Sequence, residues 1–177
     1  MLNLLQKRRS IRRYTEKMLK KEDLTSILQA GLLAPTSCNK QSWEFILVED
    51  KDILTALGNC REPKQAFIPQ AAAAVVVLGD TAKSDAWVED GSIALAFMQL
   101  QAEKLGIGSC WIQIRNRQSN QNMSANAYVS QLLSIPAPYE VLAILALGYP
   151  DEERPAYSLD NLKYEKVHQE SFGKKMF

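Results

Sequence analysis

Histidine and cysteine are both scarce in this chain of 177 residues, which contains one histidine and three cysteines. Cys38, Cys60 and Cys110 are odd in number and widely spaced, so they imply neither a disulfide framework nor a zinc site. The histidine, His168, lies in a polar C-terminal region. We expect it to be a surface or dimer-arm residue rather than a catalyst.

The chain also lacks a long apolar run. Its longest apolar stretches, such as residues 71–79 (AAAAVVVLG), fall far below the roughly 20 residues that a transmembrane helix needs. The N-terminus is apolar and then basic (MLNLLQKRR), which is the reverse of a secretory signal, and its apolar part is too short for one. We therefore expect a cytoplasmic protein that has no membrane partner.

Net charge is small, at +1, but it is unevenly distributed. Residues 1–21 carry eight lysines and arginines against Glu16 alone, which gives +7 for this segment and −6 for the remaining 156 residues. A local excess of this kind indicates a bound anion rather than a basic protein that coats nucleic acid. No aromatic interleaving or recognisable nucleic-acid module accompanies it, so we expect no nucleic-acid partner.

Apolar residues make up 46% of the chain, which is enough for an ordinary core. Hydrophobic periodicity predicts helices and strands that alternate, although most connections are too irregular for simple βαβ winding. We expect an α+β fold with a small mixed sheet wrapped by helices, in one domain (1–177) whose residues 151–177 form a C-terminal extension. The predicted helices are 20–35, 51–59, 82–105 and 124–136, and the predicted strands are 43–50, 71–80, 108–114 and 139–150.

The predicted helix 82–105 is the longest element, at roughly 36 Å for about 1.5 Å per residue. Its residues 91–102 (GSIALAFMQLQA) contain no charge. A helix that is apolar around most of its circumference needs protein on several sides. A chain of this size can hardly supply that cover alone, so we expect a dimer.

The basic segment KRRSIRRY (7–14) contains the first candidate site. In an extended segment alternate residues share a side, so Arg8, Ser10 and Arg12 would face one way and Arg9 the other. Two guanidinium groups with a hydroxyl between them suit a phosphate group, which each arginine can bind with two hydrogen bonds. A solvated basic arm or a nucleic-acid contact is the alternative reading of the same segment.

A second candidate site is the loop APTSCNKQSWEF (34–45). Pro35 ends a helix, and Thr36, Ser37 and Asn39 then place polar groups ahead of a strand. Such a loop can bond the edge of a polar heteroaromatic ring or a sugar-like chain. These residues also favour a plain helix-to-strand turn, so this loop alone leaves both readings open.

Together, RRSIRRY and APTSCNKQSWEF resemble the opening of the FMN-dependent nitroreductase family, whose pattern is close to RRSxRxF and then APSxxNxQPW. The similarity continues in the family's order through residues 56–80, the long helix, residues 105–114 and residues 140–150, with a weaker echo at 164–172. Ser42 stands where the family usually has proline, and Cys38 where it usually has a small residue. The chain also lacks the long helical insertion that covers the active site in larger members.

The resemblance implies a mainly antiparallel sheet and a homodimer with the long helix at its interface, where two FMN sites lie between the subunits. It implies that Arg8 and Ser10 hold the phosphate and ribityl end, while Arg12 approaches N1 and O2 of the ring. The loop after the first long helix would reach the FMN of the other subunit. The implied cofactor-binding residues are Arg8, Arg9, Ser10, Arg12, Pro35, Thr36, Ser37, Asn39, Gln65, Gln113, Ile114 and Lys163.

Among these, Gln65 takes the place of an amide that contacts the ribityl chain or the ring. Gln113 and Ile114 match the strand whose backbone lies beside the N5 edge of the ring, and Lys163 would be a second phosphate cation. The implied activity is reduction of nitroaromatics, quinones or similar small-molecule acceptors, with NADH or NADPH as donor. Catalysis would need no side-chain acid or base, because the flavin does the chemistry. The alternatives are an FMN-binding or storage protein and a relative that oxidises another small molecule.

Overall fold

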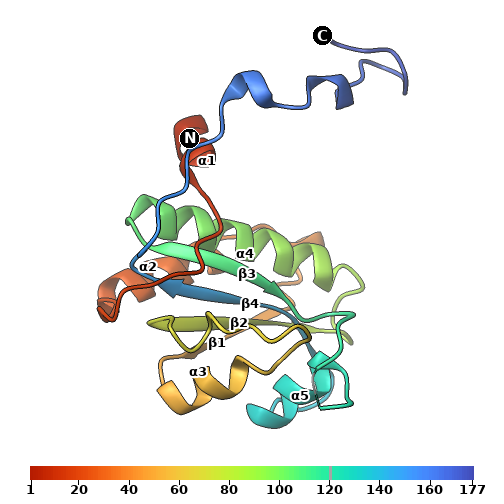
Figure 1. Cartoon of the computed structure of the whole chain (residues 1–177). Helices are drawn as coiled ribbons and strands as arrows, with labels where there is room; N and C mark the ends of the chain where they lie inside the picture. Colours follow the sequence, from red (N-terminus) through yellow and green to blue (C-terminus); the bar gives the residue numbers. More distant parts are fainter. Residues whose placement is uncertain (120) are drawn as a thin grey trace.

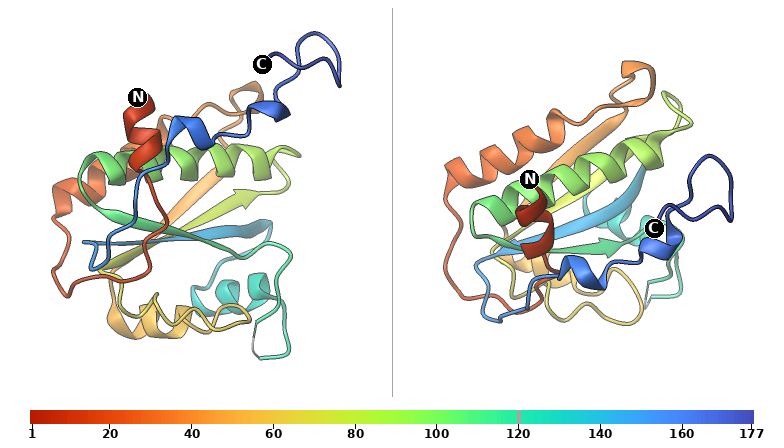
Figure 2. Two further views of the ribbon diagram at one scale, coloured as in Figure 1. Left: turned by 45° about the horizontal axis from the view of Figure 1, so that its top comes forward. Right: turned by 90° about the horizontal axis from the view of Figure 1, so that it is seen from above.

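The computed structural model describes residues 1–119 and 121–177 and has a β-sheet between two layers of helices (Figure 1). Two helices, α2 (Lys21–Leu32) and α4 (Trp87–Lys104), run side by side across one face of the sheet (Figure 2). Two shorter helices, α3 (Lys51–Leu57) and α5 (Ala125–Leu132), lie on the other face. A short N-terminal helix, α1 (Leu2–Lys7), lies against α4 near its C-terminal end. The 3-10 helices of the described residues are η1 (Ser37–Asn39), η2 (Leu159–Asn161) and η3 (Tyr164–Lys166).

The described strands form a sheet in the order β1-β2-β4-β3, and every neighbouring pair is antiparallel. The two central strands are buried on both faces, which explains why their sequences are nearly continuous apolar runs rather than alternating ones. The expectation of a mainly antiparallel sheet is confirmed, and a parallel bridge joins Ser10 to Ser109 of the edge strand. The strand bounds are β1 (Trp43–Val48), β2 (Ala73–Asp80), β3 (Gly108–Gln113) and β4 (Tyr139–Gly148).

The predicted elements are all present in the structure, although several are shorter than their sequence patterns. Helix α2 ends at Leu32 because residues before Pro35 disfavour helical backbone. The long helix α4 begins at Trp87 instead of residue 82, because the Asp80 side chain accepts the N–H groups of Ala82 and Lys83 and forms a turn there. Gly79 lets this end of the helix approach the sheet, since a Cβ there would lie 2.3 Å from the Trp87 ring.

Helix α4 is half covered by its own chain. At 18 residues it is about 27 Å long, and Leu95, Met98 and Ala102 are fully buried against the sheet and α2. Ile93 and Phe97, on another side of the same helix, are 38% and 40% exposed. In the described part of the chain, no helix is long and apolar enough to cross a membrane.

The two ends of the chain meet beside the sheet. Residues 8–15 run past the start of β3 and the end of β4, with hydrogen bonds from Ile11 N–H to the Ser109 carbonyl and from Thr15 N–H to the Tyr149 carbonyl, each 2.9 Å. Residues 149–157 return along this segment, and residues 158–177 then form an exposed arm outside the layers (Figure 1). The arm carries His168, as expected for a surface or arm residue.

Candidate cofactor site

The first part of the site is the extended segment that follows α1. Ser10 pairs with Ser109 on the edge strand β3, which fixes the alternation of side chains around it. Burial raises the pKa of the Cys110 thiol on β3, and the nearby guanidinium groups of Arg12 and Arg8 oppose that rise. The alternation around Ser10 predicts that Arg8 and Arg12 share one side of the segment, and both guanidinium groups act electrostatically on Cys110.

Arg9 points the other way, towards the returning C-terminal segment. Its guanidinium group donates to the carbonyl of Pro155 and lies 4.3 Å from the centre of the Tyr157 ring. Arg13 lies 3.8 Å from the carboxylate of Asp151. In residues 1–119 and 121–177, neither Arg8 nor Arg12 takes part in an ion pair. Arg9 has no ion pair among these residues either, so its charge is also unneutralised. Arg8 and Arg12 are the two unpaired arginines that flank Ser10 on the expected face.

This set of donors fits the phosphate of FMN. Arg8 and Ser10 are half-buried and Arg12 is exposed, so the groups can be reached from solvent while their backbone is fixed by β3. Two guanidinium forks and a hydroxyl provide charge-assisted hydrogen bonds to a dianionic group. The residues present therefore match the chemistry of the cofactor that the resemblance implies.

A second group of predicted residues lies at the far end of β3. The Gln113 side chain is engaged within the chain, since it accepts from Trp111 Nε1 at 2.9 Å and donates to the Arg115 carbonyl at 3.1 Å. The backbone is engaged as well, since Ile114 N–H donates to the Leu142 carbonyl at 3.2 Å. Arg61 Nη1 lies 3.4 Å from the Gln113 carbonyl, and its buried Nε has no hydrogen-bond partner in the part of the chain described.

The loop that carries Gln65 joins these two groups. Phe67 lies beneath Arg12, with the guanidinium carbon 5.9 Å from the ring centre. Gln65 is half-buried, and its backbone N–H bonds to the Gly58 carbonyl at 2.8 Å. The structure thus gathers Arg8, Ser10, Arg12, Gln65, Gln113 and Ile114 around one edge of the sheet.

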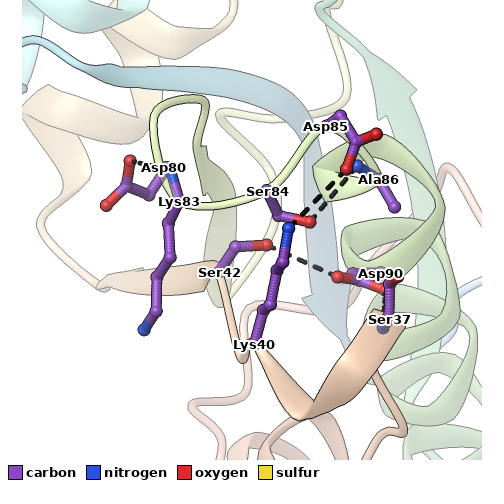
Figure 3. A network of polar contacts seen from close by, with 9 residues as sticks. All are labelled: Ser37, Lys40, Ser42, Asp80, Lys83, Ser84, Asp85, Ala86 and Asp90. Carbon is purple, nitrogen blue, oxygen red and sulfur yellow. Dashed lines mark hydrogen bonds and ion pairs between the residues drawn. The ribbon is translucent and has the colours of Figure 1, made fainter.

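The loop after α2 is held in an unusual backbone conformation. Cys38, Asn39 and Gln41 all have positive φ, at 49°, 53° and 47°, a region that residues other than glycine seldom adopt. The buried carboxylate of Asp90 accepts the Ser37 N–H at 2.8 Å and lies 3.5 Å from the Ser42 hydroxyl (Figure 3). The loop is therefore fixed from the first turn of α4, whose positive dipole end also favours a carboxylate.

Further polar contacts surround this loop in Figure 3. Lys40 lies 3.8 Å from the Asp85 carboxylate, and Lys83 Nζ donates to the Gln41 carbonyl at 3.2 Å. The Thr36 hydroxyl accepts the Gln41 N–H at 3.0 Å. Four residues of this loop are exposed to solvent: Pro35, Ser37, Cys38 and Asn39. Their side chains are therefore free to contact another molecule.

A single chain does not bring the arginine segment and the loop after α2 together. The loop is attached to α4 at Asp90, whereas Arg9 and Ile11 line a cavity of about 150 Å³ with Glu103 near the other end of that helix. Thirteen positions along an α-helix span about 20 Å. Lys163 is exposed on the arm and has no hydrogen bond or ion pair to Arg8, Ser10 or Arg12 among the described residues.

The structure also identifies residues that sequence reasoning missed. Asp90 fixes the loop after α2, Glu152 bonds to the backbone of the arginine segment, and Arg61 lies beside Gln113. Asp90 carried a usable signal, since it is the last charge before the uncharged run 91–102. No group of three or more potential metal-binding histidine, cysteine or acidic residues occurs in the described residues.

Comparisons with known proteins agree with this geometry. The family model described as "Nitroreductase family" matches residues 5–85 and 55–149. A curated relative from Archaeoglobus fulgidus, whose name includes NAD(P)H nitroreductase, is 36% identical over 176 residues, which cover 97% of this chain and 98% of that protein.

Solved structures are similar over nearly the whole chain. An FMN-dependent nitroreductase from Clostridium difficile R20291 superposes with a TM-score of 0.95 at 46% identity, covering 97% of this chain and 100% of that one. An NADPH:FMN oxidoreductase from Vibrio harveyi, solved with NAD+, gives a TM-score of 0.82 at 26% identity, covering 98% and 78% of the two chains.

Proposed function

The chain belongs to the nitroreductase family and is an FMN-dependent NAD(P)H oxidoreductase, and we propose that it reduces nitroaromatics, quinones or similar small acceptors by a ping-pong mechanism. One observation supports the cofactor site most directly: the guanidinium groups of Arg8 and Arg12, on either side of Ser10 in the sequence, form no ion pair among the described residues. Reduced nicotinamide is a cytoplasmic metabolite, so we place the reaction there.

We assign the phosphate to Arg8 and Ser10 and the polar edge of the flavin ring to Arg12. The backbone of Gln113 and Ile114 would face the ring at the end of β3, because the Gln113 side chain is already bonded to Trp111 and Arg115. Gln65 would add an amide contact from the neighbouring loop. Arg9 is held by Pro155 and Tyr157, so any contribution it makes to the phosphate would be by charge alone.

FMN, when bound, supplies the redox chemistry by taking two electrons from the nicotinamide and giving them to the acceptor. The residues of the chain bind and orient the cofactor and leave its reactive face open to both substrates in turn. The two buried thiols of the chain do not interfere with this chemistry. Burial raises the pKa of Cys60 to about 12 and also raises the pKa of Cys110. Both thiols stay protonated at neutral pH and do not compete as nucleophiles.

We further propose a homodimer in which the loop Pro35–Asn39 of each chain completes the site of the other. Two features support it: the loop is rigid and exposed, and it is attached to α4 far from the arginine segment. An apolar groove of about 300 Å³ between α1, α2 and α4 is lined by Leu33, Phe97 and Leu100 and offers a surface for the second copy. Lys163, on the exposed arm, would reach a phosphate only in such an assembly.

The experiment that tests the proposed function is turnover by the purified, FMN-loaded protein. NADH or NADPH oxidation should require both bound FMN and an acceptor such as a nitroaromatic or a quinone. A protein that binds FMN but oxidises neither donor would be the storage protein that the sequence left open. A protein that reduces neither acceptor yet oxidises another small molecule would favour the other alternative.

A further inference from the structure

The C-terminal segment 149–157 is hydrogen-bonded along the arginine segment over its whole length. Tyr157 exchanges two hydrogen bonds with Gln6, at 2.9 and 3.0 Å, and Asp151 N–H donates to the Arg13 carbonyl at 2.9 Å. Arg9 donates to the Pro155 carbonyl between these points. The proposed phosphate segment therefore lies between β3 on one side and this returning segment on the other.

Glu152 makes the central contact between the two segments. One of its carboxylate oxygens accepts the backbone N–H of Arg12 at 2.6 Å and that of Arg13 at 3.2 Å. The other oxygen accepts from Arg154, at 2.8 and 2.9 Å. The side chain is only 11% exposed, and the Arg12 N–H is the main cause of a lowered pKa for this carboxyl group.

Two successive backbone N–H groups that point at one anion form a small anion-binding concavity. In this chain Glu152 fills that concavity, which leaves the side chains of Arg8 and Ser10 as the groups proposed to bind the phosphate of FMN. The same two bonds fix the backbone at Arg12 and Arg13, just beyond the last β3 contact at Ile11. The bond from Asp151 N–H to the Arg13 carbonyl also holds this stretch, and Glu152 adds the contact to the Arg12 N–H.

We propose that Glu152 is a positioning residue for FMN: it holds the arginine segment so that Arg8 and Ser10 face the phosphate while Arg12 faces the ring edge. This inference rests on the proposed function. Glu152 is itself an anion near the proposed site of an anionic ligand. A positioning role therefore predicts a change in FMN affinity opposite to the one that charge repulsion alone predicts. Removal of its charge alone would strengthen phosphate binding, whereas loss of its positioning role weakens it.

The test compares FMN with riboflavin, which lacks the phosphate, in fluorescence titrations of the apoprotein. Glu152→Ala should weaken FMN binding about tenfold, equivalent to about 1.4 kcal/mol, and weaken riboflavin binding less, because riboflavin lacks the phosphate that Arg8 and Ser10 are proposed to bind. Glu152→Gln should weaken FMN binding by about threefold, because a neutral acceptor forms hydrogen bonds of roughly half the strength. Asp151→Asn is the matched control: it removes the same charge from a side chain that is 60% exposed, and FMN affinity should not fall.

Tighter FMN binding by Glu152→Ala, or an equal loss of FMN and riboflavin, would overturn the inference while the proposed function stands. If Glu152→Ala does not fold, Glu152→Gln decides the question by the same ratio of the two affinities. Failure of the wild-type protein to bind FMN would overturn the proposed function, and the inference with it.

Discussion

The carboxylate of Asp90, in the first turn of α4, accepts the backbone N–H of Ser37 at 2.8 Å. This bond joins the helix proposed for the dimer interface to the loop proposed to reach the partner's cofactor. Asp90 is 2% exposed and also lies near the Ser42 hydroxyl. Loop conformation and helix position are therefore coupled within the chain.

Asp90→Ala should lower the free energy of unfolding by about 1–3 kcal/mol, because it leaves a buried N–H without its charged acceptor. Asp90→Asn keeps an acceptor oxygen at the same place and should lower the free energy of unfolding by less. Chemical denaturation monitored by tryptophan fluorescence measures both changes. Glu89→Gln, at an exposed position of the same turn, is the control, and a loss as large as that of Asp90→Ala would contradict the assigned role.

The sequence predicted the order and type of the main elements well because their apolar periodicity is strong. It missed α1 and placed the start of α4 five residues early, since both depend on contacts that periodicity does not encode. The turn at residues 80–84 is set by the Asp80 side chain. The sheet is mainly antiparallel, as expected, with a parallel bridge at Ser10.

Only those features of the candidate site that depend on the spacing of neighbouring residues could be predicted from the sequence. Alternation along residues 8–12 predicts Arg8 and Arg12 on one side and Arg9 on the other, and Arg9 does reach the returning segment at Pro155. Glu152 could not be found this way, because its partners at Arg12 and Arg13 lie about 140 residues earlier in the chain. The roles of the individual residues towards FMN stay predictions.

Arg12→Gln should lower the reduction potential of bound FMN by a few tens of millivolts. The reason is that Arg12 is assigned to the ring edge where negative charge appears on reduction, and about 30 mV corresponds to 1.4 kcal/mol for two electrons. Arg8→Ala is the matched comparison: it should weaken FMN retention about tenfold to a hundredfold and move the potential less. Potential titration of FMN-saturated proteins checks this, and the reverse order of shifts would show that the two roles are exchanged.

The three cysteines should differ in how fast their thiols react. Cys38 is exposed, whereas Cys60 and Cys110 are buried with raised pKa values. At pH 8 a thiol with a pKa of about 12 is ionised in roughly one molecule in ten thousand, and the thiolate is the reactive form. Ellman's reagent should therefore modify one thiol per native chain quickly and the others only after unfolding. Rapid modification of more than one would contradict the burial of the other two, and Cys38→Ser should abolish the fast phase.

Phe97→Asp should convert the proposed dimer to a monomer, because the ring is 40% exposed on α4 and Ile93, one turn earlier, is exposed with it. Burial of an unpaired charge in an interface is strongly unfavourable. Size-exclusion chromatography with light scattering measures the mass, and FMN binding should fall with it. Thr55→Asp, at an exposed position on the opposite side of the sheet, should leave the mass unchanged. A wild-type protein that is already monomeric when folded and FMN-loaded would refute the shared site.

Anaerobic stopped-flow absorbance of the FMN-loaded protein tests the central claim most directly. Mixing with NADH or NADPH should bleach the flavin absorbance, and a second mix with a nitroaromatic or a quinone should restore it after the nicotinamide has been consumed. Recovery without residual donor is the signature of a ping-pong mechanism. Flavin that stays oxidised with both donors, or that is bleached and not restored by any acceptor, would contradict the assignment as an NAD(P)H oxidoreductase of such acceptors.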